Sequence, residues 1–399
     1  MLFRPRNVLA FISIFVVCIL FFKPPPLHGA SSTFEYLETF AKKFPEISNA
    51  TLGFQQVFVI NLPERSDRRD AGTLAAALSE IDATWIDGVA GQHVLEKVLP
   101  EDSAGKGISK GNKGSWRAHM NVLQRIVQHN IGSALILEDD ADWDVRLKSQ
   151  LQVFAQAARA FTQRVPGKSQ QSFAEELLSS RFPDREQDFN RLPYTVPPRL
   201  SPYGDSWDVL WLGHCGTEIP RVPKKVNMSA LKVLVPDDPT VPAPRHLKAH
   251  PFALQDAIGE LYPPHTRVVH LSMNTTCTQA YAVSQRGARK LLWQFGLQTF
   301  TTGWDLMLRD WCDGSYTQAS TDSTNGNLPT KLPVCVTVQP PLFSQHYGKG
   351  AASDITAPGG GFISKKKEMT PYIRLSVRLN MERMVNGAGL EDLVDQWED

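Results

Sequence analysis

One segment limits the possible folds more than any other, because a mostly apolar run leads directly into acidic residues. Residues 133–137 (SALIL) form a short run of a kind that is typical of a strand buried on both faces of a sheet. Four carboxylates follow over five positions: Glu138, Asp139, Asp140 and Asp142. In open α/β sheets, ligands bind outside the carboxyl ends of the strands. The segment therefore predicts a ligand site at the end of this strand.

The acidic cluster favours a divalent cation as its ligand. Neighbouring carboxylates repel one another unless a cation or protons separate them. Hard oxygen ligands suit Mg²⁺ or Mn²⁺, and a metal held by one or two carboxylates commonly shares its other positions with substrate phosphates. The competing interpretation is a solvated acidic loop or a helix N-terminus, where Asp residues cap freely.

Strands and helices alternate along the chain around this segment. We expect strands at 56–62, 83–87, 133–137, 208–212 and 279–283, and helices at 67–81, at 114–130 and up to residue 292. This alternation predicts an α/β, doubly wound, Rossmann-like domain. We expect the domain to span residues 52–360, with surface insertions at 163–206, 219–267 and 313–333, followed by a helical tail at 361–399.

A basic cluster follows the first predicted strand. Asn61 and Leu62 end that strand, and three arginines lie beside a predicted helix start: Arg65, Arg68 and Arg69. Guanidinium groups and helix N–H groups bind phosphates, so this turn is a candidate site for a nucleotide diphosphate. The alternative is a charged helix N-terminus with internal salt bridges.

The helix expected at 114–130 carries a histidine on its inward face. His119 lies one turn after Trp116, and Lys113 directly precedes the helix. Taken by itself, such a histidine is typical of a core side chain with satisfied hydrogen bonds.

The N-terminus predicts a membrane segment. Residues 8–22 are apolar and are flanked by basic residues at Arg4, Arg6 and Lys23. The run is short, since a bilayer span takes roughly 20 apolar residues, and a cleavable signal peptide is the competing interpretation. We favour an uncleaved anchor because His28 stands where a cleavage site needs a small residue. We expect a single-pass type II protein with a cytosolic tail at 1–7, an anchor at 8–22 and a stem at 23–51.

Sequons and cysteines agree with a lumenal placement of the remaining chain. N-glycosylation sequons begin at Asn49, Asn227 and Asn274. Four cysteines lie beyond the leader, at Cys215, Cys277, Cys312 and Cys335. They allow three disulfide pairings, among which the sequence does not choose, and buried free thiols are the alternative.

The net charge argues against one class of partner. The chain has 42 Lys and Arg residues against 41 Asp and Glu residues. Proteins that bind nucleic acid usually carry a basic excess, so we expect no nucleic-acid partner.

Taken in order, these motifs resemble glycosyltransferase family 25, which contains lipooligosaccharide and collagen β-galactosyltransferases. The segments 59–69, 86–91, 111–119 and 137–140 resemble its opening strand and turn, a short glycine segment, a helix start and the LEDD metal motif. Further similar segments lie at 210–213, 278–291, 304–306, 344–345 and 353–355. The helix start departs from the family pattern, because Ser115 replaces a cysteine and Ala118 replaces a serine. The resemblance covers residues from about 55 to 357.

The resemblance implies a GT-A fold and an inverting transfer of a sugar, commonly galactose, from a UDP-sugar donor. It implies Mn²⁺ or Mg²⁺ on Asp139 and Asp140. Asp142 or His346 would complete the shell of the ion, and His346 is our own candidate, without a counterpart in the family pattern. The implied donor contacts are Asn61, Leu62, Arg65, Arg68, Arg69, Lys113, His119, Glu138 and Asp139.

Direct displacement needs a base that accepts the proton of the acceptor hydroxyl, and Asp305 is our candidate. A helix cap is the alternative role for this carboxylate. The neighbouring Trp304 is a candidate for stacking on a sugar or, alternatively, a core residue.

The sequence as a whole thus predicts a metal-dependent glycosyltransferase anchored in the Golgi or ER membrane. Its acceptor would be a glycan or a glycoprotein. The alternative is a lumenal carbohydrate-binding relative that has lost catalysis.

Overall fold

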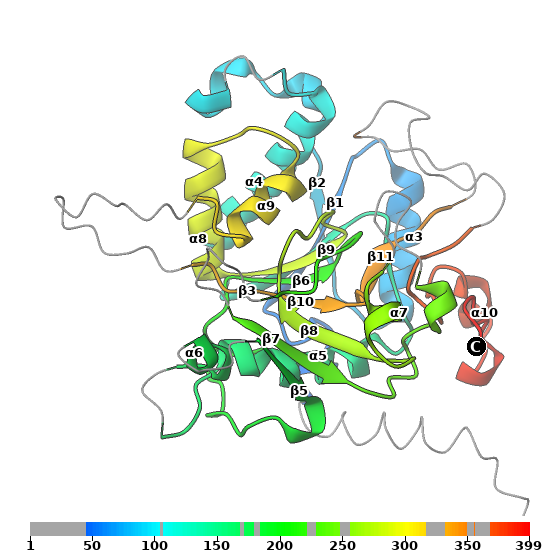
Figure 1. Cartoon of the computed structure of the whole chain (residues 1–399). Helices are drawn as coiled ribbons and strands as arrows, with labels where there is room; N and C mark the ends of the chain where they lie inside the picture. The colour runs from blue at the N-terminus through cyan, green and yellow to red at the C-terminus, as the bar shows by residue number, and fades with distance from the viewer. Residues whose placement is uncertain are drawn as a thin grey trace, which may run out of the picture. The chain divides into compact units, whose positions relative to one another are not determined.

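A mixed, eleven-stranded β-sheet organises the chain in the computed structural model (Figure 1). Its main path runs β2-β1-β3-β9-β6-β10-β8-β7-β5, and β11 pairs with β4 and β6. The strands are β1 (Gln56–Asn61), β2 (Thr84–Asp87), β3 (Ser133–Glu138), β4 (Ala141–Trp143), β5 (Asp184–Asp188), β6 (Val209–Gly213), β7 (Ala230–Val235), β8 (Arg267–Leu271), β9 (Ala280–Ser284), β10 (Cys335–Gln339) and β11 (Phe343–Gln345).

The structure describes residues 45–103, 107–167, 171–178, 184–221, 229–247, 256–316, 332–348, 355 and 368–399. The predicted cytosolic tail, the anchor, most of the stem and the sequon at Asn227 lie outside these ranges. Within them, no helix has the length and apolar character needed to cross a membrane.

The helices cover the sheet and connect its strands. The α-helices are α3 (Ser66–Leu78), α4 (Lys110–Gln128), α5 (Leu147–Thr162), α6 (Phe173–Leu178), α7 (Ile258–Leu261), α8 (Gln285–Trp293), α9 (Trp304–Cys312) and α10 (Met381–Val385). Short 3₁₀ turns are Pro45–Ser48, Gly91–His93, Glu96–Val98, Glu101–Ser103, Phe189–Arg191, Pro244–His246 and Leu390–Asp392, and a π-helical turn is Gln294–Gln298.

The segment β1–α3–β2–α4–β3 is a parallel α/β unit, as its sequence pattern predicts. β1 pairs in parallel with both β2 and β3. Helix α4 begins where the Ser109 hydroxyl accepts a hydrogen bond from the Asn112 backbone N–H, and Trp116, Met120 and Leu123 point into the core. Figure 1 shows α4, α8 and α9 grouped together, and they share this core.

Strand β9 is antiparallel to its neighbours β3 and β6, so the sheet is mixed. Because β9 runs in the opposite direction, its first residues lie beside the carboxyl ends of β3 and β6. Thr278 and Gln279, just before β9, therefore lie next to Glu138. The antiparallel strand delivers polar side chains to the edge where the acidic cluster was predicted.

Two expectations about the outer parts of the domain differ from the structure. The stretches predicted as surface insertions contain β5 and the buried strand β7, which extend the sheet beyond β8. Many prolines flank these strands, and this proline content indicated surface loops. For this reason the mostly apolar run at 230–235 was not predicted as a strand. The described part of the predicted helical tail, 368–399, holds one α-helix and one 3₁₀ turn. In its remainder, backbone hydrogen bonds join Leu375 to Val145 and Val377 to Trp143 of β4.

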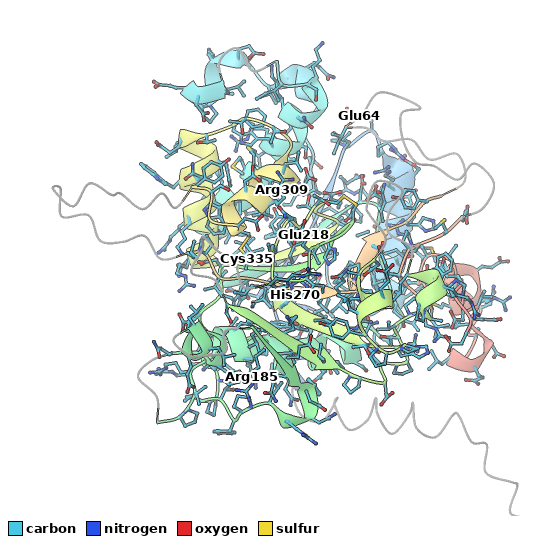
Figure 2. The ribbon with its side chains drawn as sticks, in the orientation of Figure 1. Glu64, Arg185, Glu218, His270, Arg309 and Cys335 are labelled. Carbon is cyan, nitrogen blue, oxygen red and sulfur yellow. A yellow bond between two sulfur atoms is a disulfide. The ribbon has the colours of Figure 1, made fainter. Side chains whose placement is uncertain are left out.

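Two disulfides select one of the three possible pairings. Cys215 after β6 is bonded to Cys277 before β9. Cys312 at the end of α9 is bonded to Cys335 at the start of β10, and Figure 2 labels Cys335. The side chains of the sequon residues Asn49 and Asn274 are exposed.

Candidate active site

The acidic turn after β3 is the centre of the candidate site. Asp139 accepts a hydrogen bond of 2.8 Å from Asn61 Nδ2 at the end of β1, and one of 2.6 Å from Arg68 Nη1 of α3. The same Arg68 atom lies 3.2 Å from Asp140 Oδ2. Parallel pairing of β1 and β3 brings these segments together, because the two strands end at the same edge. Three predicted donor contacts, Asn61, Arg68 and Asp139, thus converge with Asp140, and Asp139 and Asp140 are both predicted metal ligands.

Asp140 is held by its neighbours on one oxygen only. Gln345 Nε2 of β11 donates to Asp140 Oδ2 over 3.2 Å. Burial raises the pKa of Asp140, and the positive charge of Arg68 opposes that shift. Asp140 Oδ1 is buried and finds no hydrogen-bond partner among the described residues, and the same holds for Asn61 Oδ1. Buried acceptors without partners are unfavourable, so these oxygens are suited to a cation or a donor group from a ligand.

The side chain of Asp142 faces the interior, away from Asp139 and Asp140. Its carboxylate is fully buried and accepts hydrogen bonds from the hydroxyls of Thr370 and Ser376 and from the backbone N–H groups of Trp143 and Arg378. These four donors use its acceptor capacity. Asp142 therefore has a structural role in this arrangement, and not the metal-ligand role that the sequence suggested.

His346 belongs to the same buried cluster. Its Nδ1 atom lies 3.1 Å from Thr370 Oγ1 and 3.9 Å from Asp142 Oδ2. Its backbone N–H donates to the carbonyl of Asp140 over 2.8 Å. His346 thus contacts the acidic turn through its backbone, whereas its ring contacts the C-terminal segment.

The four predicted metal ligands do not form one shell. Across the described ranges, no three His, Cys, Asp or Glu side chains are grouped so that they could hold a metal ion. The atoms that fit an ion are carboxylate oxygens of Asp139 and Asp140 with the amide oxygen of Asn61. Such a small set suits Mg²⁺ or Mn²⁺ sharing its shell with substrate phosphates.

Glu138 faces the opposite side of β3, toward β9. Its carboxylate accepts a 2.7 Å hydrogen bond from the Thr278 hydroxyl. Burial raises the pKa of Glu138 to about 8, and the nearby charges of Asp140 and Asp305 add to the shift. With no cation bound, Glu138 therefore keeps its proton at neutral pH.

Asp305 lies in the first turn of α9, on the same side as Glu138. The backbone N–H of Cys277 donates to Asp305 Oδ2 over 3.0 Å, and no side chain caps the N-terminus of α9. Asp305 is thus oriented by a loop across the sheet edge, in contrast to the helix-cap alternative. It is partly exposed, and its charge acts on Glu138 at the end of β3.

Several predicted donor contacts lie apart from this centre. Arg65 is paired with Asp67, and Arg69 lies over the Trp85 ring and 3.7 Å from Asp87. Lys113 is paired with Glu96. The partly buried Leu62 packs beside Gly88. For Arg65 and Arg69 the alternative of a charged helix N-terminus with local ion pairs describes the structure better.

His119 and Trp304 are core residues beneath the site. His119 is buried, its Nδ1 lies 2.9 Å from the Tyr281 hydroxyl, and its ring stacks on Trp304 at 5.1 Å. Burial lowers the pKa of His119 to about 3, so the ring is neutral. Both side chains are buried, so the structure favours the core alternative for His119 and for Trp304 over a donor contact and sugar stacking.

Sequence reasoning gave no site role to two residues that contact the acidic turn, Gln345 and Arg378. Arg378 donates from Nη2 to the carbonyl of Asp139 over 2.8 Å and from Nε to the carbonyl of Ala141 over 3.0 Å. Nothing local marked this arginine, because it lies among other basic residues far along the chain. Backbone carbonyls as its partners leave no trace in a sequence.

Comparisons with known proteins agree with the motif pattern. A family model described as "Glycosyltransferase family 25 (LPS biosynthesis protein)" matches residues 54–307. Procollagen galactosyltransferase 1-B of Xenopus laevis is 30% identical over 141 residues, which are 33% of this chain and 22% of that protein. Procollagen galactosyltransferase 1 of Danio rerio is 32% identical over 120 residues, 27% of this chain and 20% of that protein. A human relative named "Inactive glycosyltransferase 25 family member 3" is 25% identical over 119 residues, 27% of this chain and 20% of that protein. The matched region thus spans about a fifth of the length of these relatives.

Proposed function

Because the chain belongs to glycosyltransferase family 25, we propose that it transfers a sugar, galactose, from a UDP-sugar to a hydroxyl of a glycan or glycoprotein acceptor. The observation that carries this proposal is the pair of carboxylates at one sheet edge. Among the residues that the structure describes, one buried oxygen of Asp140 has no hydrogen-bond partner, and Asp305 is oriented and partly exposed. The named activities of the Xenopus and Danio relatives favour galactose as the sugar.

Asp139, Asp140 and Asn61 are the residues that would hold Mn²⁺ or Mg²⁺. When bound there, the ion would stabilise the negative charge that develops on the departing diphosphate. Arg68, which lies between the two aspartates, would sit next to the same phosphates and add a second positive charge.

Asp305 would act on the acceptor. In an inverting displacement, the acceptor oxygen forms a bond to the anomeric carbon while the bond from that carbon to the UDP oxygen breaks. The proton of the acceptor hydroxyl passes to the Asp305 carboxylate, and UDP leaves with the electron pair of the broken bond. The hydrogen bond from Cys277 N–H to Oδ2 leaves Oδ1 for that proton.

The same proposal places the enzyme in the lumen of the ER or Golgi, anchored by residues 8–22 as a type II protein. The two disulfides support an oxidising compartment, in which such bonds persist. The exposed sequons at Asn49 and Asn274 agree with that compartment.

An inactive carbohydrate-binding relative is the second candidate, favoured by two observations. A human relative carries "inactive" in its name, and Arg68 lies against both carboxylates that would hold the metal. In this reading the guanidinium neutralises the acidic pair permanently, and no cation enters.

A donor screen separates the two candidates. The full chain is incubated with Mn²⁺ and a panel of UDP-sugars, and UDP release and sugar transfer are measured. We expect release from UDP-galactose that Asp140→Ala abolishes and Asp237→Asn preserves, since Asp237 is an exposed carboxylate in the turn after β7. If no UDP-sugar is hydrolysed or transferred, and Asp140→Ala changes nothing, the enzyme proposal is wrong.

A further inference from the structure

The C-terminal segment 369–380 packs along β4, directly after the acidic turn. Val145 N–H donates to the Leu375 carbonyl, and Val377 N–H donates to the Trp143 carbonyl, each over 3.0 Å. Leu375 N–H donates to Asp144 Oδ2 over 3.0 Å. The segment thus extends the sheet edge at the site, although it lies outside the part of the chain that the family model matches.

Asp142 joins this segment to the acidic turn. Thr370 and Ser376 donate their hydroxyls to the same carboxylate oxygen, and the backbone N–H of Arg378 donates to the other. A buried carboxylate with several donors is stable only while every donor stays in place, because an unpaired buried charge is strongly unfavourable. The position of Asp142, two residues after Asp140, therefore depends on the C-terminal segment.

Arg378 contacts the acidic turn on both sides of Asp140. Its guanidinium donates to the carbonyls of Asp139 and Ala141, the residues before and after Asp140. The bond to the Asp139 carbonyl holds the peptide plane before Asp140, and the bond to the Ala141 carbonyl holds the plane between Ala141 and Asp142. The plane directly after Asp140 is held by the backbone N–H of His346. An apolar side chain of similar size would fill the same space as Arg378 without donating these hydrogen bonds.

We propose that Thr370, Ser376 and Arg378, together with Asp142, form a C-terminal clasp that positions Asp139 and Asp140 for the metal and the diphosphate of the donor. Arg378 is a positioning residue in this clasp, because it acts through the backbone of the turn and does not touch the donor. The inference rests on the proposed function. It adds that the catalytic unit needs residues from beyond the matched region.

The chain contains a matched control for Arg378. Arg374 lies four residues earlier in the same segment, and its guanidinium pairs with Asp395 over 2.6 Å and with Asp399 over 3.1 Å. None of its contacts reaches the acidic turn. Removing either arginine deletes guanidinium contacts within the same segment, but only the removal of Arg378 frees the acidic turn.

The test compares Arg378→Met, Arg378→Lys and Arg374→Met in the full chain. UDP binding is measured by calorimetric titration at several Mn²⁺ concentrations, which gives the Mn²⁺ concentration at half-saturation. The values of kcat and of KM for the UDP-sugar are measured alongside. Loss of a partner that orients metal ligands typically costs 10- to 100-fold in metal affinity or activity. We expect a shift of about that size for Arg378→Met, a smaller one for Arg378→Lys, and wild-type values for Arg374→Met. Equal responses of Arg378→Met and Arg374→Met would overturn the clasp.

Two further measurements keep the clasp testable in other cases. If Arg378→Met does not fold, Thr370→Val removes one hydrogen-bond donor to Asp142 at nearly constant volume. An unchanged Mn²⁺ concentration at half-saturation would then contradict the proposal.

If the wild-type chain binds neither UDP nor Mn²⁺, the proposed function fails. Amide hydrogen exchange at residues 139–143 then decides the clasp by itself. We expect faster exchange there in Arg378→Met than in Arg374→Met, and equal rates would overturn it.

Discussion

Two carboxylates at one edge of the sheet are held in different ways. Asp140 lies in a turn that Arg68, Gln345 and the C-terminal clasp surround with hydrogen bonds and positive charge. Asp305 has a single backbone donor, the N–H of Cys277, in a loop that a disulfide ties to β6. The difference matches the proposed tasks. A metal ligand needs a fixed, charge-balanced position, whereas a base needs a defined direction and access to the acceptor.

The largest effect that separates the two regions is expected for Asp305→Asn. Removal of a general base lowers turnover by about 10²- to 10⁴-fold, because no side chain then takes up the proton of the acceptor hydroxyl. The amide keeps the size of the side chain and leaves the acidic turn unchanged. We therefore expect kcat to fall by this amount while the affinity for the UDP-sugar stays near the wild-type value, as measured by calorimetry and initial rates. Weaker donor binding at full turnover would contradict the base assignment.

The second effect concerns the disulfide that ties the Cys277 loop. In the double variant Cys215→Ser, Cys277→Ser, the loop loses its disulfide. The backbone N–H of residue 277, which donates a hydrogen bond to Asp305, then becomes less well placed. Small misplacements of reacting groups cost up to about 10²-fold, so we expect kcat to fall by about 10-fold or more with little change in donor KM.

The second disulfide provides the control for that variant. Cys312→Ser with Cys335→Ser releases the far end of α9, and loss of a disulfide generally costs about 2–4 kcal/mol of stability. We expect a lower thermal midpoint in both double variants but a lower kcat only in the first. Equal kcat values in the two would show that the loop does not position Asp305.

Acid should lower the free energy of unfolding through His119, which is buried in the core beneath the site. Burial lowers the pKa of His119 to about 3 from its ordinary value of 6.5. Between these values the unfolded chain binds a proton that the folded protein does not, so the contribution of His119 to stability falls as the pH falls from 6.5 toward 3. The slope reaches at most about 1.4 kcal/mol per pH unit. Urea unfolding at pH 7 and pH 5 should show a smaller loss in His119→Gln than in the wild type, and identical losses would contradict this account.

The smallest effect is expected for Arg65→Ala. Arg65 is paired with Asp67 at the start of α3, and it holds the pKa of that carboxyl at about 2. A solvent-exposed ion pair is worth at most about 1 kcal/mol, so we expect the donor KM to rise by less than about fivefold in initial-rate measurements. A tenfold or larger rise would show that Arg65 leaves Asp67 and contacts the donor.

Short-range patterns predicted the part of the fold that carries β1, β3 and α4, because strand and helix periodicity are local properties. The acidic turn could be located for the same reason, since the apolar run and the carboxylates are adjacent in sequence. The metal set could not be predicted correctly. Whether Asp142 faces the ligand or the interior depends on Thr370 and Ser376, more than 200 positions away.

Two further points were open in the sequence for similar physical reasons. His119 lies at the spacing of a core residue and also of a family motif, and only packing against Trp304 and Tyr281 decides between them. The disulfide pairing depends on β9 running antiparallel beside β6, which brings Cys277 to Cys215. Long-range pairing of this kind cannot be derived from the spacing of four cysteines.

The central claim is that Asp140 binds the metal and the diphosphate of the UDP-sugar, whereas Asp305 accepts the proton of the acceptor hydroxyl. Titration of UDP into Asp140→Asn and Asp305→Asn, each with Mn²⁺ present, tests it most directly. The account predicts that Asp140→Asn loses most of its UDP affinity, whereas Asp305→Asn binds UDP as the wild type does and yet fails to turn over. Undiminished UDP binding by Asp140→Asn, or lost binding by Asp305→Asn, would contradict it.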